Sequence, residues 1–410
     1  MKASIETFTR HLESEERRLG VRTRSRREAD QRSFRLAVEA IACNLLITAM
    51  TGQDATLSVP RSHDAMWGQG RYRNPVYGQH FRDALDLLET LKLASRATKG
   101  YRFSATARQA TTIRATSKLT RHLPLGVTDW SAFRCVAEPE LIVLKPRKDD
   151  DRRTQPVDYK DTARTERWRR EMQAINAWLA AAPISVIADK RRTIRLDNEG
   201  QPVEPYRRSL RRVFNNENWN AGGRLFGGFW MTMERTERFR TIRIAGEEIA
   251  NVDFSSLFPR LAYARAGIEQ PDEDVYDLIG DGTCRDGWKT LINAMLFATR
   301  PLRGWPTGAR EGLPAGIKLR DAVDAIKGKH SPIAKLLERG LGFELMSHEA
   351  GMLVSVVTAL FKNGVTALPL HDSVLVPRSN AATAKDFMEQ EFKYRTGSAR
   401  AFVKIDFEPI

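Results

Sequence analysis

The sequence has 410 residues, a formal net charge of +15 and a hydrophobic content of 41%. This length allows two or three domains with their own cores, and the hydrophobic content is typical of a globular protein. The basic excess predicts a polyanionic partner, because each Lys or Arg placed on a phosphate releases counterions. The alternative is a basic protein without such a partner.

Cysteine usage and the N-terminus bear on the compartment. Cys43, Cys135 and Cys284 are too few and too scattered for a zinc site or a disulfide framework, which predicts a reduced, intracellular protein. We therefore expect it in the cytoplasm, and on the nucleoid if it is bacterial. No apolar signal core opens the chain, and polar residues interrupt the longest apolar stretch, 37–50, well below the ~18–20 residues of a membrane span. The expected polyanion is nucleic acid, with no membrane partner.

Residues 1–30 form a highly charged segment, which we treat as separate from the first domain. A run of this kind is usually a solvated helix face or a tail, and the alternative is an arm that binds nucleic acid. The basic residues of this run are Arg17, Arg18, Arg22, Arg24, Arg26 and Arg27.

Residues 31–145 are expected to form a winged-helix-like DNA-binding domain. Apolar residues recur at helical spacing from Phe34 onward and again from Phe81 onward, which predicts two amphipathic helices. Two short strands should follow, joined by a tight turn at Lys99-Gly100. Lys99 and Arg102 would then contact DNA from the wing. The alternative is a small helical domain that only packs on its neighbour.

A polar, aperiodic stretch at 146–165 predicts a linker. A helix is expected to follow it, from about 163 to 181, and to end before Pro183.

The segment 249–267 carries the first candidate site residue. Residues 249–254 predict a short apolar strand with Asp253 near its end, where an ionised carboxylate is costly to bury unless something neutralises it. The alternative is that Asp253 caps the helix that follows.

The segment 367–379 contains a second acid in similar surroundings. Two apolar runs flank His371 and Asp372, which predicts a β-hairpin with the acid at its tip. An ordinary polar turn is the alternative. If Asp253 and Asp372 meet in one cleft, they repel each other unless divalent cations lie between them. Two cations bridged by carboxylates are the general apparatus of in-line phosphoryl transfer.

A helix at 284–300 lies between the two acids in the sequence. Arg285, Lys289, Asn293 and Phe297 recur every four residues and should share one face. Cations in the first turns oppose the helix dipole, so this pattern is explained if they face a triphosphate. The alternative is a surface helix with two unrelated basic residues.

At these segments the sequence resembles the palm and fingers of the nucleotide polymerase superfamily. VDFSSLFPRL (252–261) is similar to motif A, RDGWKTLINAMLFA (285–298) to motif B of family A DNA polymerases and phage-type single-subunit RNA polymerases, and LPLHDSVLV (368–376) to motif C. NAGGRLFGGFW (220–230) resembles the Gly-Arg motif that precedes motif A. The motifs keep the order of the family, and the resemblance covers about residues 210–410.

The resemblance implies an α+β chain with a right-hand palm, an antiparallel sheet with helices, at 249–410 together with reduced fingers. It implies a helical, thumb-like, template-contacting region at 166–248. The fingers are expected to be reduced because Asp253 and Lys289 are only 36 residues apart.

The resemblance also implies residue roles. Asp253 and Asp372 would be catalytic and would bind two Mg²⁺ ions, with Mn²⁺ as an alternative. Nucleotide contacts would come from Arg285, Lys289, Asn293, Phe297 near the base and Phe258 near the sugar, and DNA contacts from Arg224 on the backbone and His371 near the primer terminus.

Several positions depart from the family patterns. Ser373 follows the His-Asp pair where family A DNA polymerases have Glu, as in phage-type RNA polymerases. Phe258 is bulky, as at this place in family B, and would collide with a 2′-hydroxyl, which favours deoxynucleotides. Phe297 and Ala298 replace the usual Tyr and Gly.

No match to a proofreading exonuclease precedes the palm. By analogy with the family, we expect a DNA polymerase or primase-polymerase in replication initiation of a phage, plasmid or other mobile element. Its partners would be template and primer DNA, dNTPs or rNTPs, and a helicase or single-strand-binding protein. The alternatives are a single-subunit-type RNA polymerase or RNA primase, a DNA-binding replication protein with a decayed palm, and a nuclease.

Overall fold

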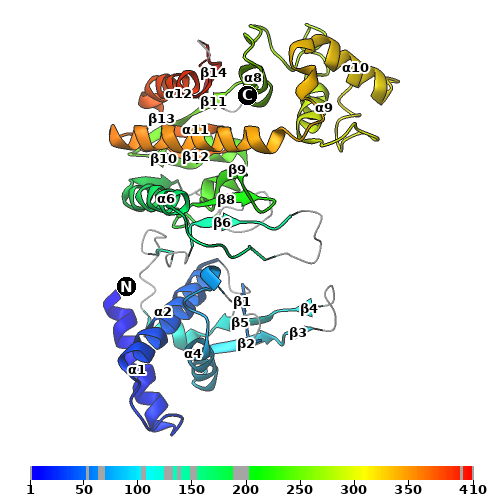
Figure 1. The fold of residues 1–410 in the computed structure, drawn as a ribbon. Helices are drawn as coiled ribbons and strands as arrows, with labels where there is room; N and C mark the ends of the chain where they lie inside the picture. The colour runs from blue at the N-terminus through cyan, green and yellow to red at the C-terminus, as the bar shows by residue number, and fades with distance from the viewer. Residues whose placement is uncertain are drawn as a thin grey trace. The chain divides into compact units, whose positions relative to one another are not determined.

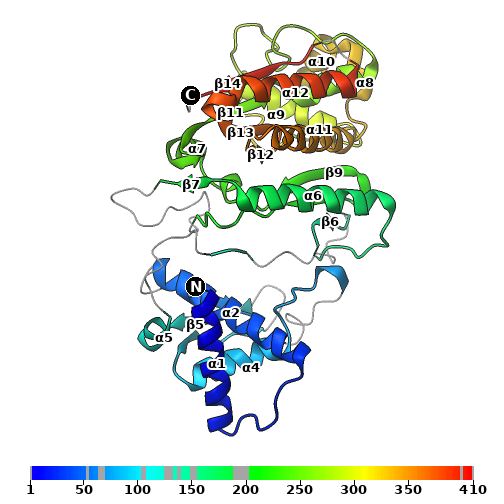
Figure 2. The same cartoon turned by 90° about the vertical axis from the view of Figure 1, so that its left-hand side faces the viewer.

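The computed structural model describes residues 2–51, 55–62, 70–102, 108–123, 133–135, 140–147, 155–187, 203–397 and 400–408. The chain is α+β, as expected, with helices and several antiparallel sheets (Figures 1 and 2). It divides into two compact units. Unit 1 comprises Met1–Glu140 and Ala188–Ser209, and unit 2 comprises Leu141–Ile187 and Leu210–Ile410.

Unit 1 is a helical unit with a small antiparallel sheet of order β1-β5-β2. Helices α2 and α4 pack against each other, and both contact the sheet. The elements are α1 (Lys2–Arg18), α2 (Glu28–Thr51), β1 (Leu57–Val59), η1 (Gly70–Tyr72), α4 (Gln79–Thr90), β2 (Ala94–Thr98), β3 (Tyr101–Arg102), β4 (Arg108–Gln109), β5 (Thr111–Ala115) and α5 (Ser117–His122). The two helices predicted from apolar spacing are therefore confirmed as α2 and α4.

The charged N-terminal segment is part of unit 1, contrary to our expectation of a separate segment at 1–30. Its first helix, α1, buries Ile5, Phe8 and Leu12 in the core of the unit. These residues follow helical spacing, but the many charges of the other faces obscure them. Arg26 is likewise engaged, in a two-point ion pair with the buried Glu16.

The predicted tight turn at Lys99-Gly100 is wrong, because β2 and β3 do not pair with each other. β2 pairs with β5 and β3 pairs with β4, so the chain passes through Gly100 into a longer hairpin. A Cβ on Gly100 would lie 2.7 Å from the Thr111 backbone nitrogen. Glycine is thus needed there for the close approach of β5 rather than for a turn.

Helix α2 is, within the described residues, the one helix long and apolar enough by length and composition to cross a membrane. We expected no such segment, because polar residues interrupt 37–50, but single polar residues do not disqualify a whole helix. In unit 1 this helix supplies Phe34, Ile41 and Leu45 to the hydrophobic core. That is the behaviour of a core helix.

Unit 2 is built on an antiparallel sheet of order β12-β13-β11-β10-β7, with β14 also paired to β11. A second sheet has the order β6-β8-β9, and helix α11 contacts both β9 and α12 (Figure 1). The elements are β6 (Ile142–Leu144), α6 (Ala163–Ala181), β7 (Ile184–Val186), β8 (Arg211–Asn215), β9 (Asn218–Phe226), η3 (Phe229–Met231), α7 (Arg235–Thr241), β10 (Ile242–Ile244), β11 (Glu247–Phe254), α8 (Leu257–Ala266), α9 (Arg285–Phe297), α10 (Leu319–Lys329), η4 (Ser331–Leu336), α11 (Gly342–Lys362), β12 (Leu368–Leu370), β13 (Ser373–Pro377), η5 (Arg378–Asn380), α12 (Ala381–Thr396) and β14 (Val403–Asp406).

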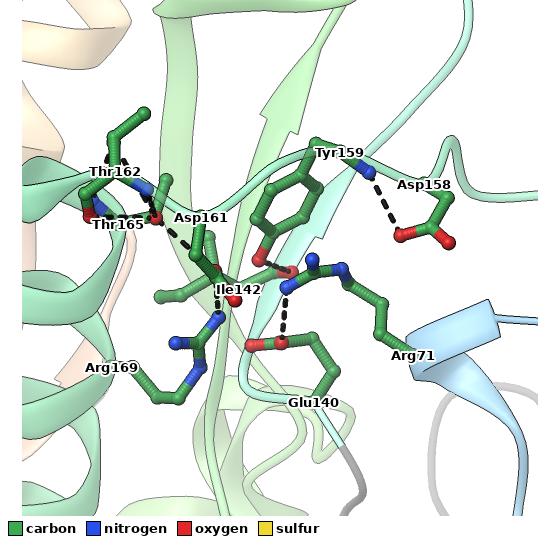
Figure 3. A network of polar contacts seen from close by, with 9 residues as sticks. All are labelled: Arg71, Glu140, Ile142, Asp158, Tyr159, Asp161, Thr162, Thr165 and Arg169. Carbon is green, nitrogen blue, oxygen red and sulfur yellow. Dashed lines mark hydrogen bonds and ion pairs between the residues drawn. The ribbon is translucent and has the colours of Figure 1, made fainter.

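The predicted helix at 163–181 is confirmed as α6, and the described part of the predicted linker is tied to unit 2 (Figure 3). Tyr159 donates its hydroxyl to the Ile142 carbonyl oxygen at 3.0 Å. Thr162 and Thr165 form a reciprocal capping box that begins α6. Figure 3 also shows the ion pair of Arg71 with Glu140, both in unit 1, at 3.1 Å.

The expected division at residue 249 does not separate compact units, because 166–187, 210–248 and 249–410 all belong to unit 2. The region 166–248 is also less helical than expected. Its described part contains strands β7 to β10 besides α6 and α7. Strands β7 and β10 belong to the same sheet as Asp253, which explains why no boundary falls there.

Candidate active site

Strand register brings the two candidate acids together. β11 pairs with β13 on one side and β14 on the other, and Asp253 lies opposite Ser373 and opposite Lys404. Asp372 immediately precedes Ser373, and its carbonyl oxygen accepts a hydrogen bond from the Phe254 amide at 3.4 Å. Residues directly opposite in antiparallel strands share one face of the sheet. The pairing thus places the acids of two distant segments at one end of adjacent strands.

The predicted hairpin is confirmed, with a two-residue turn at His371 and Asp372 between β12 and β13. His371 adopts a left-handed conformation, with φ of 58°, which costs a non-glycine residue free energy. Two contacts fix the turn. Ser373 donates its hydroxyl to the Leu370 carbonyl oxygen at 3.0 Å, and the buried Trp230 donates its indole N–H to the Pro369 carbonyl oxygen at 2.8 Å.

The alternative that Asp253 caps the following helix is wrong. Asp253 lies within β11, and the N-cap of α8 is Ser256, whose side chain makes no capping hydrogen bond. Ser256 is itself left-handed, with φ of 54°. Strained backbone thus flanks both acids, a pattern that clusters at functional sites.

Helix α9 supplies another wall of the same cavity, and the predicted shared face is found for its polar residues. Arg285, Lys289 and Asn293 all line the cavity together with both acids, while the apolar face of the helix, including Leu291 and Met295, is buried. Among the described residues, no carboxylate forms an ion pair with Lys289. Its charge therefore remains available to a ligand.

The cavity has a volume of about 620 Å³ and is lined by charges of both signs. The acids are Asp253, Asp272, Asp274 and Asp372, and the cations are Arg224, Arg260, Arg285, Lys289 and Lys404.

The acid pair has lost much of its hydration. Burial, and then the negative charge of Asp372, raise the pKa of Asp253 to about 7, against the opposing effect of Lys404. Burial also raises the pKa of Asp372, although Arg224 and Lys289 counteract it. Two carboxylates that resist ionisation side by side need a further cation to be held together as anions.

The donor set fits magnesium. Asp253 and Asp372 supply carboxylate oxygens, the donor type that Mg²⁺ prefers; among the described residues no group of three or more His, Cys, Asp or Glu side chains is arranged to hold a metal. Mg²⁺ in phosphoryl-transfer sites is commonly held by one or two carboxylates, with substrate phosphates and water completing its coordination. A carboxylate pair beside a cationic helix meets this description.

Arg224 reaches the cavity from β9, after two glycines that need left-handed backbone. Gly222 has a φ of 87°, a conformation that favours glycine, and a Cβ there would lie 2.4 Å from the side-chain nitrogen of Asn215 and 3.2 Å from the Val213 carbonyl oxygen. The Arg224 guanidinium makes a two-point ion pair with Glu349 of α11, with both N–O distances 2.7 Å. Glu349 is 1% exposed, and burial raises its pKa to about 7 despite this partner.

Of the two aromatic residues predicted to contact the nucleotide, only one lines the cavity. Phe258 lines the cavity, 5.6 Å below the Arg224 guanidinium. Phe297 is not among the lining residues; its ring packs edge-on against Phe258 and against Phe343, at centroid distances of 5.7 and 5.2 Å. Phe297 therefore supports Phe258 instead of reaching the cavity itself, because its ring is held between two others.

Several lining residues were missed from the sequence. Asp274 accepts a hydrogen bond from the Tyr276 amide at 3.0 Å and pairs with Arg285, so one of the two predicted phosphate-binding cations already has a carboxylate partner. Tyr276 donates its hydroxyl to Asn293 at 3.1 Å. Lys404, Arg260 and Asp272 are further charged residues of this kind. Val403 and Ile405 flank Lys404 in β14, an alternation that is typical of a strand. Only the strand register shows that Lys404 faces Asp253.

Two of the remaining predicted DNA contacts lie in unit 1 and the third lies in unit 2. Lys99 is exposed between β2 and β3, and Arg102 lies in β3 opposite Arg108. His371 lines the cavity in unit 2.

Comparisons with known proteins identify no family for this chain. No protein-family model matches the sequence, and no curated protein matches it. The chemistry of the cavity is therefore the basis on which a function can be assigned.

The raised pKa of Asp253 predicts a pH-dependent gain in stability for Asp253→Asn. The carboxyl ionises near pH 7 when folded and near 3.8 when unfolded, so folding binds a proton between these values and the free energy of unfolding falls as pH rises through the interval. Without divalent cations, the variant should melt higher than wild type by at least ~3 °C at pH 8, or about 1 kcal/mol, and by less at pH 5. Thermal melts of both, with the exposed-site control Asp386→Asn, measure this difference; an equal gain at both pH values contradicts it.

The buried ion pair predicts an asymmetry between single and double variants. Arg224→Ala leaves the Glu349 carboxylate buried without its partner, so we expect a loss of about 3 kcal/mol in the free energy of unfolding at pH 8. The loss should shrink at pH 6, where Glu349 can take up a proton. Adding Glu349→Gln to this variant should restore most of the stability. Denaturant melts test this; a double variant no more stable than Arg224→Ala rules the pairing out.

Proposed function

We propose that the chain is a template-directed nucleotidyltransferase, a DNA polymerase or primase-polymerase. One observation carries the proposal: Asp253 and Asp372 enter a single cavity from adjacent antiparallel strands, and the polar face of α9 lines the same cavity with Arg285, Lys289 and Asn293. A carboxylate pair suits divalent cations, and a cationic helix face suits a triphosphate. The two together are what phosphoryl transfer from a nucleoside triphosphate requires.

The acidic residues of the cavity would hold the metal, and the basic residues would bind the triphosphate. Asp253 and Asp372 would hold Mg²⁺, or Mn²⁺, and the bound metal would supply activation of the primer 3′-hydroxyl and charge compensation for pyrophosphate. Lys289 would bind the triphosphate directly. Arg285 forms an ion pair with Asp274 and would bind the triphosphate in the orientation that this pair fixes. Asn293 is oriented by the hydroxyl of Tyr276.

The sugar preference follows from Phe258 and not from Ser373. Phe258 lines the cavity and is held in place by Phe297, so a 2′-hydroxyl would have to displace a supported ring. The hydroxyl of Ser373 is engaged by the Leu370 carbonyl oxygen within the hairpin. Ser373 therefore has a structural role in the turn that does not depend on the kind of nucleotide, and Phe258 favours dNTPs as the substrates.

Unit 1 would serve as the DNA-binding module of this enzyme. Its order of helix, strand, helix and two five-residue strands, with the sheet order β1-β5-β2, is compatible with a winged helix. The β3–β4 hairpin and the segment that leads into it would form the wing, with Arg102 in β3 and Lys99 before it. A chain that joins such a module to a compact catalytic unit suits initiation of replication on a mobile element, with template and primer DNA and a helicase or single-strand-binding protein as partners.

Separate Asp253→Ala and Asp372→Ala variants should each abolish magnesium-dependent nucleotide incorporation, by at least about 10³-fold, while DNA binding changes little. Primer extension and gel shifts on the same preparations measure both properties, and Asp386→Ala on the exposed face of α12 is the matched control. Incorporation that survives either change overturns the assignment.

The same assay separates the alternatives. Wild type supplied with each nucleotide set, with and without primer, distinguishes a DNA polymerase from an RNA polymerase or primase. DNA binding without incorporation would indicate a replication protein with a decayed palm. Cleavage of the template without triphosphates would indicate a nuclease, which has no need of the cationic face of α9.

A further inference from the structure

Unit 2 carries a second basic depression, separate from the catalytic cavity in its lining. Its volume is about 900 Å³, and it lies between α6, β9, the first half of α11 and the end of α12. We call it the arginine groove and define it by its four arginines, Arg164, Arg167, Arg212 and Arg395.

Two of these arginines are fixed against one aromatic ring by neutral partners. The guanidinium groups of Arg164 and Arg212 lie 4.5 and 4.9 Å from the Trp168 ring. Arg164 donates to the Asn220 side-chain oxygen at 3.0 Å, and Arg212 donates to the Gly223 carbonyl oxygen at 3.1 Å. Carbonyl and amide oxygens orient these groups without cancelling their charge.

Of the other two arginines, one is already paired with an acid outside the lining and one is exposed. Arg395 donates to the Gly351 carbonyl oxygen at 3.0 Å and pairs with Glu391, and a Cβ on Gly351 would lie 2.8 Å from its guanidinium. Arg167 projects from α6 with 63% of its side chain exposed. Burial lowers the pKa of Arg212 to about 10; the charge of Glu171 opposes this fall, and the charges of Arg395, Arg164 and Arg167 contribute to it.

Two glutamates in the lining do not balance these charges. Glu171 lies 3.7 Å from both Arg167 and Arg212, a long separation for an ion pair. Glu344 is engaged by Arg265 at 3.2 Å. The groove therefore holds fixed cations in excess of acids, which is the arrangement that binds successive phosphates.

An aromatic chain links the groove to the catalytic cavity. Phe343 lines the groove and contacts Phe297, which contacts Phe258 of the cavity. We infer that the arginine groove binds the sugar–phosphate backbone of a single nucleic-acid strand and leads it past Phe343 toward the acid pair. The inference deepens the proposed function and rests on it for the identity of the strand. A free mononucleotide would occupy only part of a groove larger than the catalytic cavity.

The test is the binding of a fluorescent single-stranded oligonucleotide to the full chain, by anisotropy in EDTA over a salt series. Arg164→Ala/Arg167→Ala removes two exposed cations without touching the buried Arg212. Losing two phosphate contacts should lower the slope of log K against log salt by about 1.4 and weaken binding about tenfold near 0.15 M salt. Arg164→Lys/Arg167→Lys should retain most of the slope.

Arg170→Ala/Arg320→Ala is the matched control, since it removes two exposed arginines of α6 and α10 outside the groove. Unchanged affinity and slope in the groove variant would overturn the inference, and so would an equal loss of affinity in the control. Weaker binding of a mononucleotide with unchanged binding of the single strand would overturn it as well. Since EDTA removes catalysis from this assay, a groove variant that behaves as expected in a chain that incorporates no nucleotide would refute the proposed function alone. An unaffected groove variant in an active chain would refute the groove alone.

Discussion

The structure of unit 2 depends on one electrostatic constraint: two carboxylates share the end of a buried sheet. The register of β11 with β13 and β14 fixes Asp253 between Ser373 and Lys404 and leaves Asp372 beside it. Burial then raises the pKa of both acids, and the negative charge of Asp372 raises that of Asp253 further. Packing of the surrounding strands keeps the acids there at a cost in stability, which is the mark of a site retained for binding rather than for folding.

The surroundings of the acids are consistent with that constraint. Cations approach them from three separate elements, with Arg224 on β9, Lys289 on α9 and Lys404 on β14. Arg224 is itself restrained by the buried Glu349, so its position does not depend on a ligand. A site whose charged groups are fixed before substrate arrives needs little reorganisation during phosphoryl transfer.

Local patterns in the sequence predicted the elements, while pairings between distant segments had to come from the structure. Apolar spacing around Phe81 was enough for α4, and the two apolar runs that flank His371 and Asp372 were enough for the hairpin. By contrast, only the β11–β14 register shows that Lys404 faces Asp253. The turn predicted at Lys99-Gly100 is wrong because β2 pairs with β5 and not with the next strand. Phe297 kept the expected spacing but is held between two other rings, which spacing cannot show.

The central claim is that Asp253 and Asp372 together bind a divalent cation. A Mn²⁺ titration followed by electron paramagnetic resonance tests this, because the signal of free Mn²⁺ decreases when the ion binds to the protein. We expect saturable binding by wild type and by Asp386→Asn, and loss of that binding in Asp253→Asn/Asp372→Asn with the chain still folded. Equal Mn²⁺ binding by wild type and the double variant would show that the two carboxylates are not the metal site.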